Sequence, residues 1–301
     1  MQQLISLAKS LGCDVEENPV LAKYTTFHIG GQAPLLMDVP ASAAPKLLKT
    51  IQEMGQSIFW MGKGSNLLIS DKGISQIVLR LKQENPIRIS EKSLTCDGAA
   101  PLIGVCKAAR DAGLSGLEFA YGIPGSVGGG VFMNAGAYGG EIQDVFVAAK
   151  VLFPDGSVDT IFAEEMDFGY RHSALMEQGG VVLETTFLLT PKDKEEITKT
   201  MEDFLSRRKE KQPLEYASAG SFFRRPTGYY TGALIEQCGL KGFRVGDAAI
   251  SEKHAGFLVN LGSATCQDVK AVANEVKRRV LEKTGVTMQP EVRLIGETWE
   301  E

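Results

Sequence analysis

The sequence has little that would tie it to nucleic acid or to a membrane. Its 32 basic residues are outnumbered by 37 acidic ones, for a formal charge of −5, whereas nucleic-acid-binding proteins usually carry a basic excess. No apolar run approaches the ~18 residues that a membrane span needs. Residues 1–19 lack the charged and apolar regions of a secretory signal. We therefore expect no nucleic-acid partner, no membrane insertion and a cytoplasmic location.

Cysteine and histidine are too scarce and too scattered for a disulfide framework or a metal centre. There are five cysteines, an odd number, and none of them forms a CxxC pair, so disulfides are disfavoured and a zinc site is not expected. The three histidines stand far apart along the chain. We predict reduced thiols, which are usual in cytosolic proteins, and no metal site.

The composition is otherwise that of a globular protein, with an excess of glycine. Of the 301 residues, 44% are hydrophobic and 23% are charged. The 33 glycines exceed the usual share of about 7%, and many of them are clustered. Because glycine allows backbone to approach a ligand closely, these clusters are the first places to look for a binding site.

Helices and strands are both predicted, without a regular alternation. Apolar residues at helical spacing, with capping residues and glycine stops, predict helices over 42–54 (capped by Ser42), 102–113, 197–205 and 265–285 (capped by Thr265). Runs rich in β-branched and aromatic residues predict strands over 57–61, 73–81, 147–153, 181–189, 257–260 and 292–295. We therefore predict an α+β fold and not a doubly wound sheet or a barrel.

The first glycine cluster directly follows the predicted strand at 57–61. Its glycines can turn backbone N–H groups toward a ligand, and its hydroxyl and amide side chains add donors, which suits a phosphate. It fits neither a P-loop, whose glycines are spaced more widely, nor the dinucleotide fingerprint, which needs a third glycine and a following helix. A tight turn between strands explains it equally well. The cluster consists of Gly62, Lys63, Gly64, Ser65 and Asn66.

The second glycine cluster is longer and spans 121–140. Ile, Val, Phe and Met are interleaved with the glycines, so it is not a flexible linker. An apolar segment of small residues can lie against a flat ring and offer backbone donors to the polar edge of that ring. The plain alternative is a buried turn, which we favour less because two such clusters occur in one chain.

Three further segments could carry chemistry, each with an ordinary structural alternative. Arg171, in 168–173, has a fixed charge and a fork that matches a carboxylate, although many arginines are simply surface residues. Ser221, in 218–226, lacks the G-x-S-x-G context of a nucleophile, so it is better interpreted as a proton donor or hydrogen bonder, or simply as a turn serine. Glu291 begins an apolar strand and could instead pair with Arg293. His254 could be a pH switch or a base, but a structural role is the favoured interpretation.

Together these segments resemble the UDP-N-acetylenolpyruvoylglucosamine reductase (MurB) family, over nearly the whole chain. The order and spacing of the motifs are more specific than any one of them. The matching runs are TTFHIGG (25–31), GKGSNLLISD (62–71), GLEFAYGIPGSVGGGVFMNAGAYGGEI (116–142), FGYRHS (168–173), SAGSFFRRP (218–226), TGALIEQCGLKG (231–242), SEKHAGFLVN (251–260) and PEVRLIG (290–296).

The resemblance implies a flavin-binding fold of the vanillyl-alcohol-oxidase (PCMH) type with a substrate-binding domain. It implies a first FAD-binding subdomain at 1–82, with 288–301 packing back on it, a second at 83–206, and a substrate-binding domain at 207–287. FAD would be bound noncovalently. The residues implied to bind it are Gly62, Lys63, Gly64, Ser65, Asn66, Leu67, Tyr121, Gly122, Ile123, Pro124, Gly125, Ser126, Gly128, Gly129, Asn134, Gly136 and Ala137.

The implied reaction reduces UDP-N-acetylglucosamine enolpyruvate with NADPH. Hydride would pass from NADPH through the flavin to C3 of the enolpyruvyl group, and a proton would be added at C2. By resemblance, Arg171 and Glu291 stabilise the enolic charge, and Ser221 delivers the proton. The sequence leaves open whether Glu291 is itself protonated or orients its neighbours.

The residues implied to bind the nucleotide end of the substrate are less specific. The family often has Lys at the position of Arg224. The chain also resembles the shorter type of the family, which lacks an insertion carrying a Tyr loop. The candidate substrate-binding residues are Tyr170, Lys211, Arg224, Arg225 and Lys241.

Two alternatives remain at this point. One is another FAD oxidoreductase of the same fold with a different acid substrate, against which the joint presence of the three candidate catalytic residues argues. The other is a nucleotide-sugar-binding protein without catalysis, which would purify without bound flavin. The sequence gives no prediction of oligomeric state.

Overall fold

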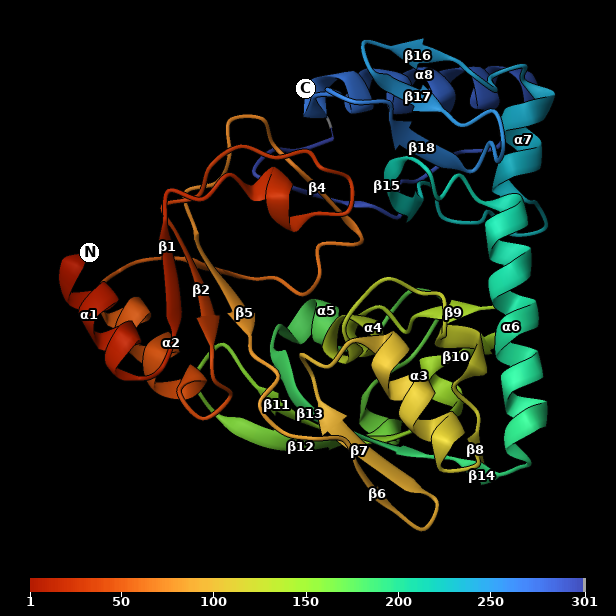
Figure 1. Ribbon diagram of the computed structural model, residues 1–301. Coiled ribbons are helices and arrows are strands. Elements are labelled where there is room, and N and C mark those ends of the chain that lie inside the picture. Colours follow the sequence, from red (N-terminus) through yellow and green to blue (C-terminus); the bar gives the residue numbers. More distant parts are fainter. Residues whose placement is uncertain (300–301) are drawn as a thin grey trace. The chain divides into compact units, whose positions relative to one another are not determined.

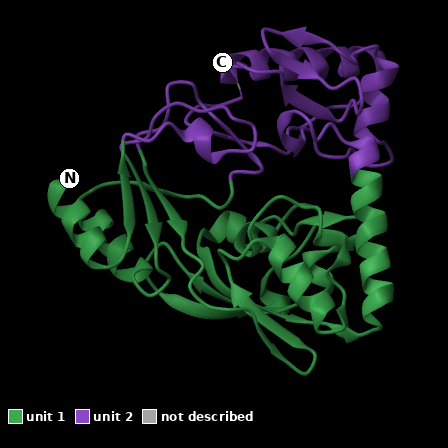
Figure 2. Ribbon diagram, viewed as in Figure 1, with its two compact units in different colours: residues 1–17, 35–63, 76–208 green, residues 18–34, 64–75, 209–301 purple. Residues whose placement is uncertain are grey.

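The computed structural model describes residues 1–299, which form two compact units. Unit 1 comprises residues 1–17, 35–63 and 76–208, and unit 2 comprises residues 18–34, 64–75 and the described residues from 209 onward (Figure 2). Each unit is therefore assembled from chain segments that are distant in sequence. No helix within residues 1–299 is both long and apolar enough to cross a bilayer.

The N-terminal part of unit 1 is a mixed four-stranded sheet covered by two helices. The first two strands are antiparallel, and the last three are parallel to one another. The apolar faces of α1 (Gln2–Ser10) and α2 (Ala44–Glu53) share one buried core with the sheet. In spatial order the strands are β1 (Asp14–Glu17), β2 (Leu35–Val39), β5 (Ile77–Leu81) and β3 (Ile58–Trp60).

The rest of unit 1 contains a five-stranded antiparallel sheet (Figure 1). Its strands, in spatial order, are β12 (Val158–Phe162), β11 (Phe146–Leu152), β13 (Val181–Leu188), β7 (Ser93–Asp97) and β6 (Arg88–Ser90). A second buried core joins this sheet to its helices. The helices are α3 (Leu102–Asp111), α4 (Val127–Phe132), α5 (Leu175–Gln178) and α6 (Lys194–Lys211).

Short elements complete unit 1. Two antiparallel pairs of two-residue strands are β8 (Leu114–Ser115) with β14 (Thr190–Pro191), and β9 (Gly136–Ala137) with β10 (Gly140–Glu141). Three 3-10 turns lie at Glu118–Ala120, Ile142–Asp144 and Ala163–Glu165. The second glycine cluster contains α4 and most of the β9–β10 hairpin, so it is ordered and not a linker.

Unit 2 is built on a four-stranded antiparallel sheet. Its strands, in spatial order, are β15 (Ala217–Ser221), β18 (Phe257–Asn260), β17 (Ala248–Ile250) and β16 (Arg244–Val245). A separate parallel pair joins β4 (Leu67–Ile69) to β19 (Arg293–Ile295). The other elements are α7 (Thr231–Gln237), α8 (Cys266–Thr284) and a 3-10 turn at Leu21–Tyr24. The four-stranded sheet, α7, α8, β4 and β19 share a third buried core.

The predicted α+β fold is confirmed, with small corrections at the element ends. The Thr265 hydroxyl accepts the N–H of Asp268, and Gly285 ends α8 at a φ of 72°, as the sequence predicted. Ser42 does not cap α2, which was an error. The residue before that helix is Ala43, and the helix begins with a proline in its first turn, where a missing N–H costs nothing.

Candidate active site

The first glycine cluster presents a row of backbone donors between β3 and β4. Within the described chain, the backbone N–H groups of Gly62, Lys63, Gly64 and Ser65 donate no hydrogen bond to protein. Gly62 and Lys63 are exposed, Ser65 is half-buried and Gly64 is buried, so the first part of the cluster is the part most open to a ligand. Consecutive inward-turned N–H groups of this kind bind anions. A strand follows the cluster, as predicted, so it is not the opening of a dinucleotide-binding helix.

The second cluster supplies similar donors where it enters α4. The N–H groups of Gly122, Gly125 and Ser126 likewise donate no bond within the described residues. The Ser126 hydroxyl is buried and accepts the N–H of Gly129 at 3.3 Å, which caps α4. The sequence analysis missed this helix, because Val-Gly-Gly-Gly-Val-Phe has poor helix propensity. Its capping serine was the available signal.

Both clusters fit a bound dinucleotide cofactor. Their unused backbone donors suit phosphate oxygens, and the small residues leave no side chain that would block a close approach. The residues predicted to bind FAD in 121–126 are half-buried or buried, apart from the exposed Pro124. The cluster therefore offers a partly covered surface, as a flat ring would require.

Arg171 is held against the second cluster, inside unit 1. Its guanidinium donates from Nη2 to the carbonyl of Gly136 at 2.7 Å, and from Nη1 to the carbonyl of Asn134 at a weak 3.5 Å. The guanidinium also lies 5.2 Å from the ring centre of Tyr170, which is 44% exposed. Gly136 must be a glycine here, since a Cβ would lie 3.2 Å from Nη1 of Arg171 and 2.6 Å from Cγ of Glu141.

Ser221 and Glu291 are neighbours in unit 2. Ser221 is exposed at the end of β15, after a bulge in which Gly220 has a φ of 82°. A residue with a side chain would be strained at that angle, so the glycine allows the strand to turn the serine outward. The next residue, Phe222, accepts the Glu291 N–H at 2.8 Å. The two candidates are thus tied together through adjacent backbone.

The first cluster also contacts the Glu291 segment within unit 2. Nδ2 of Asn66 donates to the carbonyl of Glu291 at 3.2 Å, and the N–H of Arg293 donates to the carbonyl of Asn66 at 3.0 Å. These bonds extend the parallel pairing of β4 with β19. The sequence analysis assigned Asn66 only to cofactor binding and missed this contact, which joins residues far apart in sequence.

The candidate substrate-binding cations are spread over unit 2, and Tyr170 lies in unit 1. Arg225 donates to the carbonyl of Tyr229 at 3.1 Å, and its guanidinium lies 4.0 Å from the ring centre of Tyr230. Lys241 forms an ion pair with Glu236 at 3.1 Å. Lys211 is exposed at the end of α6, and Arg224 donates its backbone N–H to Gln289 at 2.8 Å.

His254 is a structural residue, as the sequence analysis favoured. Its Nδ1 accepts the N–H of Gly256 at 3.0 Å, and its ring packs edge-on against Phe257. Burial lowers the pKa of His254, so the imidazole is neutral near pH 7. A neutral ring that already accepts a backbone hydrogen bond is a poor candidate for a general base.

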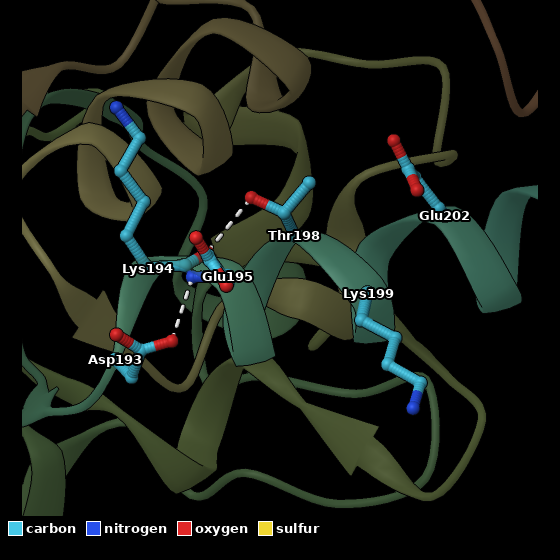
Figure 3. Close-up of a pocket in the computed structure, with 6 residues that line it drawn as sticks. All are labelled: Asp193, Lys194, Glu195, Thr198, Lys199 and Glu202. Carbon is cyan, nitrogen blue, oxygen red and sulfur yellow. Dashed lines mark hydrogen bonds between the residues drawn. The ribbon is translucent and has the colours of Figure 1, made fainter.

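A shallow hollow along the start of α6 is not a candidate active site. Figure 3 shows its six lining residues, which come from the first turns of one helix and from the residue before it. They are Asp193, Lys194, Glu195, Thr198, Lys199 and Glu202. Asp193 accepts the N–H of Glu195 at 2.9 Å, and Thr198 donates to the carbonyl of Lys194 at 2.8 Å, so both side chains serve the helix itself.

Comparisons with known proteins agree with this arrangement. A model of an FAD binding domain matches residues 41–161, which include both glycine clusters. A model of the UDP-N-acetylenolpyruvoylglucosamine reductase C-terminal domain matches residues 212–295, which include Ser221 and Glu291. The fold and the two clusters therefore define an FAD-dependent oxidoreductase.

The similarity to individual proteins extends over almost the whole chain. UDP-N-acetylenolpyruvoylglucosamine reductase of Agathobacter rectalis is 46% identical over 290 residues, covering 92% of each chain. The enzyme of that name from Limosilactobacillus fermentum is 43% identical, covering 98% of each. The crystal structure of the Thermus caldophilus reductase (MurB) superposes with a TM-score of 0.80 at 38% identity, covering 94% of this chain and 99% of that one. The chain belongs to the UDP-N-acetylenolpyruvoylglucosamine reductase family.

Proposed function

We propose that the chain reduces UDP-N-acetylglucosamine enolpyruvate to UDP-N-acetylmuramate with NADPH, using noncovalently bound FAD. This reaction supplies a precursor of peptidoglycan. Membership in the family supports the activity and the cofactor. The observation that carries the proposal is the Arg171 guanidinium, held against carbonyl oxygens of the segment that would bind the flavin. We place the reaction in the cytoplasm, in keeping with the five free cysteines.

Both glycine clusters would hold the FAD through backbone donors. When bound, FAD supplies hydride transfer between NADPH and the enolpyruvyl group. The N–H groups of residues 62–65 suit its phosphates, and those of Gly122, Gly125 and Ser126 offer further donors. The Asn134 side chain is occupied by protein contacts and the whole residue is buried, so the structure leaves it no exposed atom with which to contact FAD.

Arg171 supplies fixed positive charge for the enolpyruvyl group. As hydride is added at C3, negative charge develops at C2 and spreads into the carboxylate of the substrate. A guanidinium whose plane is already fixed by two carbonyl contacts stabilises that charge without having to reorganise. Arg171 therefore acts as an electrostatic catalyst that need not exchange a proton.

Ser221 donates a proton to C2, and Glu291 supports it. The serine hydroxyl is exposed on the strand end, so it can reach a ligand. A hydroxyl is a weak acid, but the carbanion-like C2 is a strong base, so the transfer is favourable. The backbone bond between Glu291 and Phe222 keeps the carboxyl-bearing residue beside the serine. We propose that Glu291 either stabilises the enolic charge as a protonated carboxyl or orients its neighbours through a hydrogen bond.

The charged residues of unit 2 bind the nucleotide end of the substrate. We propose that Lys211, Arg224, Arg225 and Lys241 contact the diphosphate, with Tyr170 of unit 1 also on the substrate. Cations of this kind attract a dianionic diphosphate strongly. We also propose that the substrate-binding domain comprises 207–287, after two FAD-binding subdomains at 1–82 and 83–206.

The proton-donor role of Ser221 is tested by measuring flavin reduction and flavin reoxidation separately in the variant Ser221→Ala. Under anaerobic conditions, NADPH is added first to bleach the flavin, and the enolpyruvyl substrate is added second. We expect bleaching at the normal rate and reoxidation by substrate about 10²–10⁴-fold slower, because only the second step needs the proton. Stopped-flow absorbance near the flavin band of about 450 nm measures both.

Ser263→Ala is the matched control, because Ser263 is an exposed serine of the same unit. It should leave both half-reactions unchanged. If both half-reactions slowed equally in Ser221→Ala, the proton-donor role would be wrong. If the native protein purified without flavin, or if the enolpyruvyl substrate did not reoxidise it, the proposed function itself would be wrong.

A further inference from the structure

Asn134 is a fully buried polar side chain next to the segment that would bind FAD. Its exposed fraction is 0%, and it follows α4 with a φ of 41°, which asparagine tolerates better than most residues. Nδ2 donates to Oε2 of Glu141 at 3.0 Å and to the carbonyl of Gly169 at 2.9 Å. Oδ1 accepts the N–H of Gln143 at 3.0 Å. The amide is thus satisfied by three protein partners.

One of these partners lies in the turn that carries Arg171. Gly169 and His172 exchange backbone hydrogen bonds of 3.2 and 3.1 Å, which closes the turn around Arg171. Both Asp167 and Arg171 have positive φ, of 42° and 53°. For residues with side chains this conformation costs about 1–3 kcal/mol each, so it persists only where surrounding contacts enforce it.

Asn134 contacts the Arg171 turn through both its side chain and its backbone carbonyl. Its side chain holds the carbonyl of Gly169, two residues before Arg171. Its own carbonyl accepts from Nη1 of Arg171, and the carbonyl of Gly136, two residues later, accepts from Nη2. The short segment 134–136 therefore makes hydrogen bonds both to the backbone of the turn and to the guanidinium of Arg171.

We propose that Asn134 is a positioning residue for substrate reduction, which sets the angle at which Arg171 presents its guanidinium. This inference rests on the proposed role of Arg171 in substrate reduction, and it adds a residue that acts only through Arg171. Asparagine suits the position because one side chain must donate twice and accept once. An aspartate could not donate to Gly169, and it would place a second carboxylate against Glu141.

The experiment uses the flavin-loaded full chain and the variant Asn134→Gly, which removes the side chain and tolerates the positive φ. We expect the flavin to remain bound and NADPH to bleach it at a rate within about twofold of normal. Reoxidation by the enolpyruvyl substrate should slow by about 10–100-fold, the scale of a misplaced catalytic group. The loss should appear in kcat more than in KM.

A double-mutant cycle distinguishes positioning from a merely structural role. In a chain that already carries Arg171→Lys, Asn134→Gly should cause no further loss, because the residue acts through the arginine. Asn85→Gly is the control. Asn85 also belongs to unit 1 and donates to a carboxylate, that of Asp97 at 3.0 Å, so its effect should be small and independent of Arg171→Lys.

The outcomes separate this inference from the proposed function. If Arg171→Lys slows substrate reduction and Asn134→Gly adds a full independent loss, the positioning role is wrong and the function stands. If Arg171→Lys has no effect, the proposed role of Arg171 is wrong. Should Asn134→Gly fail to hold flavin, the near-isosteric Asn134→Asp replaces it in the same cycle, with the same coupling expected.

Discussion

The two glycine clusters each hold a segment that carries a candidate catalytic residue, but they do so by different means. In unit 1, Asn134 makes three side-chain hydrogen bonds and is fully buried. In unit 2, Asn66 is half-buried and donates to the carbonyl of Glu291. Arg171 lies in an irregular turn with positive φ, whereas Glu291 lies two residues before the regular parallel pairing of β19 with β4.

The difference shows when a side chain is needed to position a residue. A strand is held by its ladder of backbone hydrogen bonds, so the Glu291 segment needs little more than β4 beside it. An irregular turn has no ladder, and its strained residues return to ordinary angles unless side chains prevent it. We therefore expect unit 1 to be sensitive to the loss of one amide and unit 2 to be tolerant.

The largest expected effect concerns the irregular turn that carries Arg171. Arg171→Lys should slow reoxidation of the reduced flavin by substrate about 10²–10³-fold, because an ammonium cannot reproduce the fork of the guanidinium. Bleaching by NADPH should be unaffected. Anaerobic stopped-flow absorbance measures both steps, and unchanged turnover would remove Arg171 from the active site.

Arg88→Lys is the matched control for that variant. Arg88 forms an exposed ion pair with Glu184 on a strand of the same unit, and a lysine can still make that pair. Its half-reactions should match those of the unaltered chain. A comparable loss in Arg88→Lys would mean that any arginine in unit 1 is sensitive, and the special role of the 171 turn would be lost.

A second prediction concerns the ion pair between Lys270 and Glu297, which lies just after β19 in unit 2. Lys270 is buried in α8 and pairs with Glu297 at 3.0 Å. Lys270→Met should lower the free energy of unfolding by about 3 kcal/mol, the lower end of the range for a broken buried pair, because the Glu297 side chain is 20% exposed. Urea denaturation at pH 7 measures it, and a loss below about 0.5 kcal/mol would show that the pair is only a surface contact.

The same pair gives the stability a pH dependence. Burial alone would raise the pKa of Glu297, but hydrogen bonds from Lys270, Cys266 and Ser70 outweigh it and lower the pKa. A lowered folded pKa stabilises the protein fully above the unfolded value of about 4.3, and this stabilisation is lost as the pH falls through the folded pKa. Glu297→Gln should flatten the acid limb of the stability profile. An unchanged limb would contradict the assignment.

The smallest expected effect concerns the Glu291 segment of unit 2, which we expect to tolerate the loss of one side-chain amide. Asn66→Ser removes the bond to the Glu291 carbonyl but keeps the strand pairing of β4 with β19. One neutral hydrogen bond contributes about 0.5–1.5 kcal/mol, so substrate reduction should slow no more than about tenfold. Steady-state kinetics beside Asn134→Gly give the comparison. A larger loss in Asn66→Ser than in Asn134→Gly would reverse the order that we draw from the two clusters.

Several parts of the fold could be predicted from local patterns. The helix from Thr265 to Gly285 and the strand at 257–260 were predicted closely, because a cap, a stop and an apolar stretch all lie within a short segment. The short helix α4 was missed because its three glycines oppose helix formation, and its Ser126 cap and the packing of Val127 and Val131 stabilise it instead. Ser42 was wrongly chosen as a cap because several residues near a helix start can look suitable.

The candidate site was predictable as a set of motifs but not as a set of contacts. Arg171, Ser221 and Glu291 were identified through a resemblance to a family, and no local rule would have chosen them. The contact of Asn66 with Glu291 joins residues separated by 225 positions. The outward turn of Ser221 depends on a bulge at Gly220, which has positive φ. This bulge interrupts the pairing of β15 with β18, so it is a feature of the folded sheet.

By itself, the sequence determined the chemistry that is available: two glycine-rich segments, a fixed cation, a hydroxyl and a carboxyl. It also determined the family, because many motifs in one order are more specific than any single motif. Only the tertiary structure decided that the Asn134 amide donates to the Gly169 carbonyl in the Arg171 turn, and that the Asn66 amide donates to the Glu291 carbonyl. The physical reason is that hydrogen bonds depend on distance in space, and burial leaves each polar group only the partners that the fold brings to it.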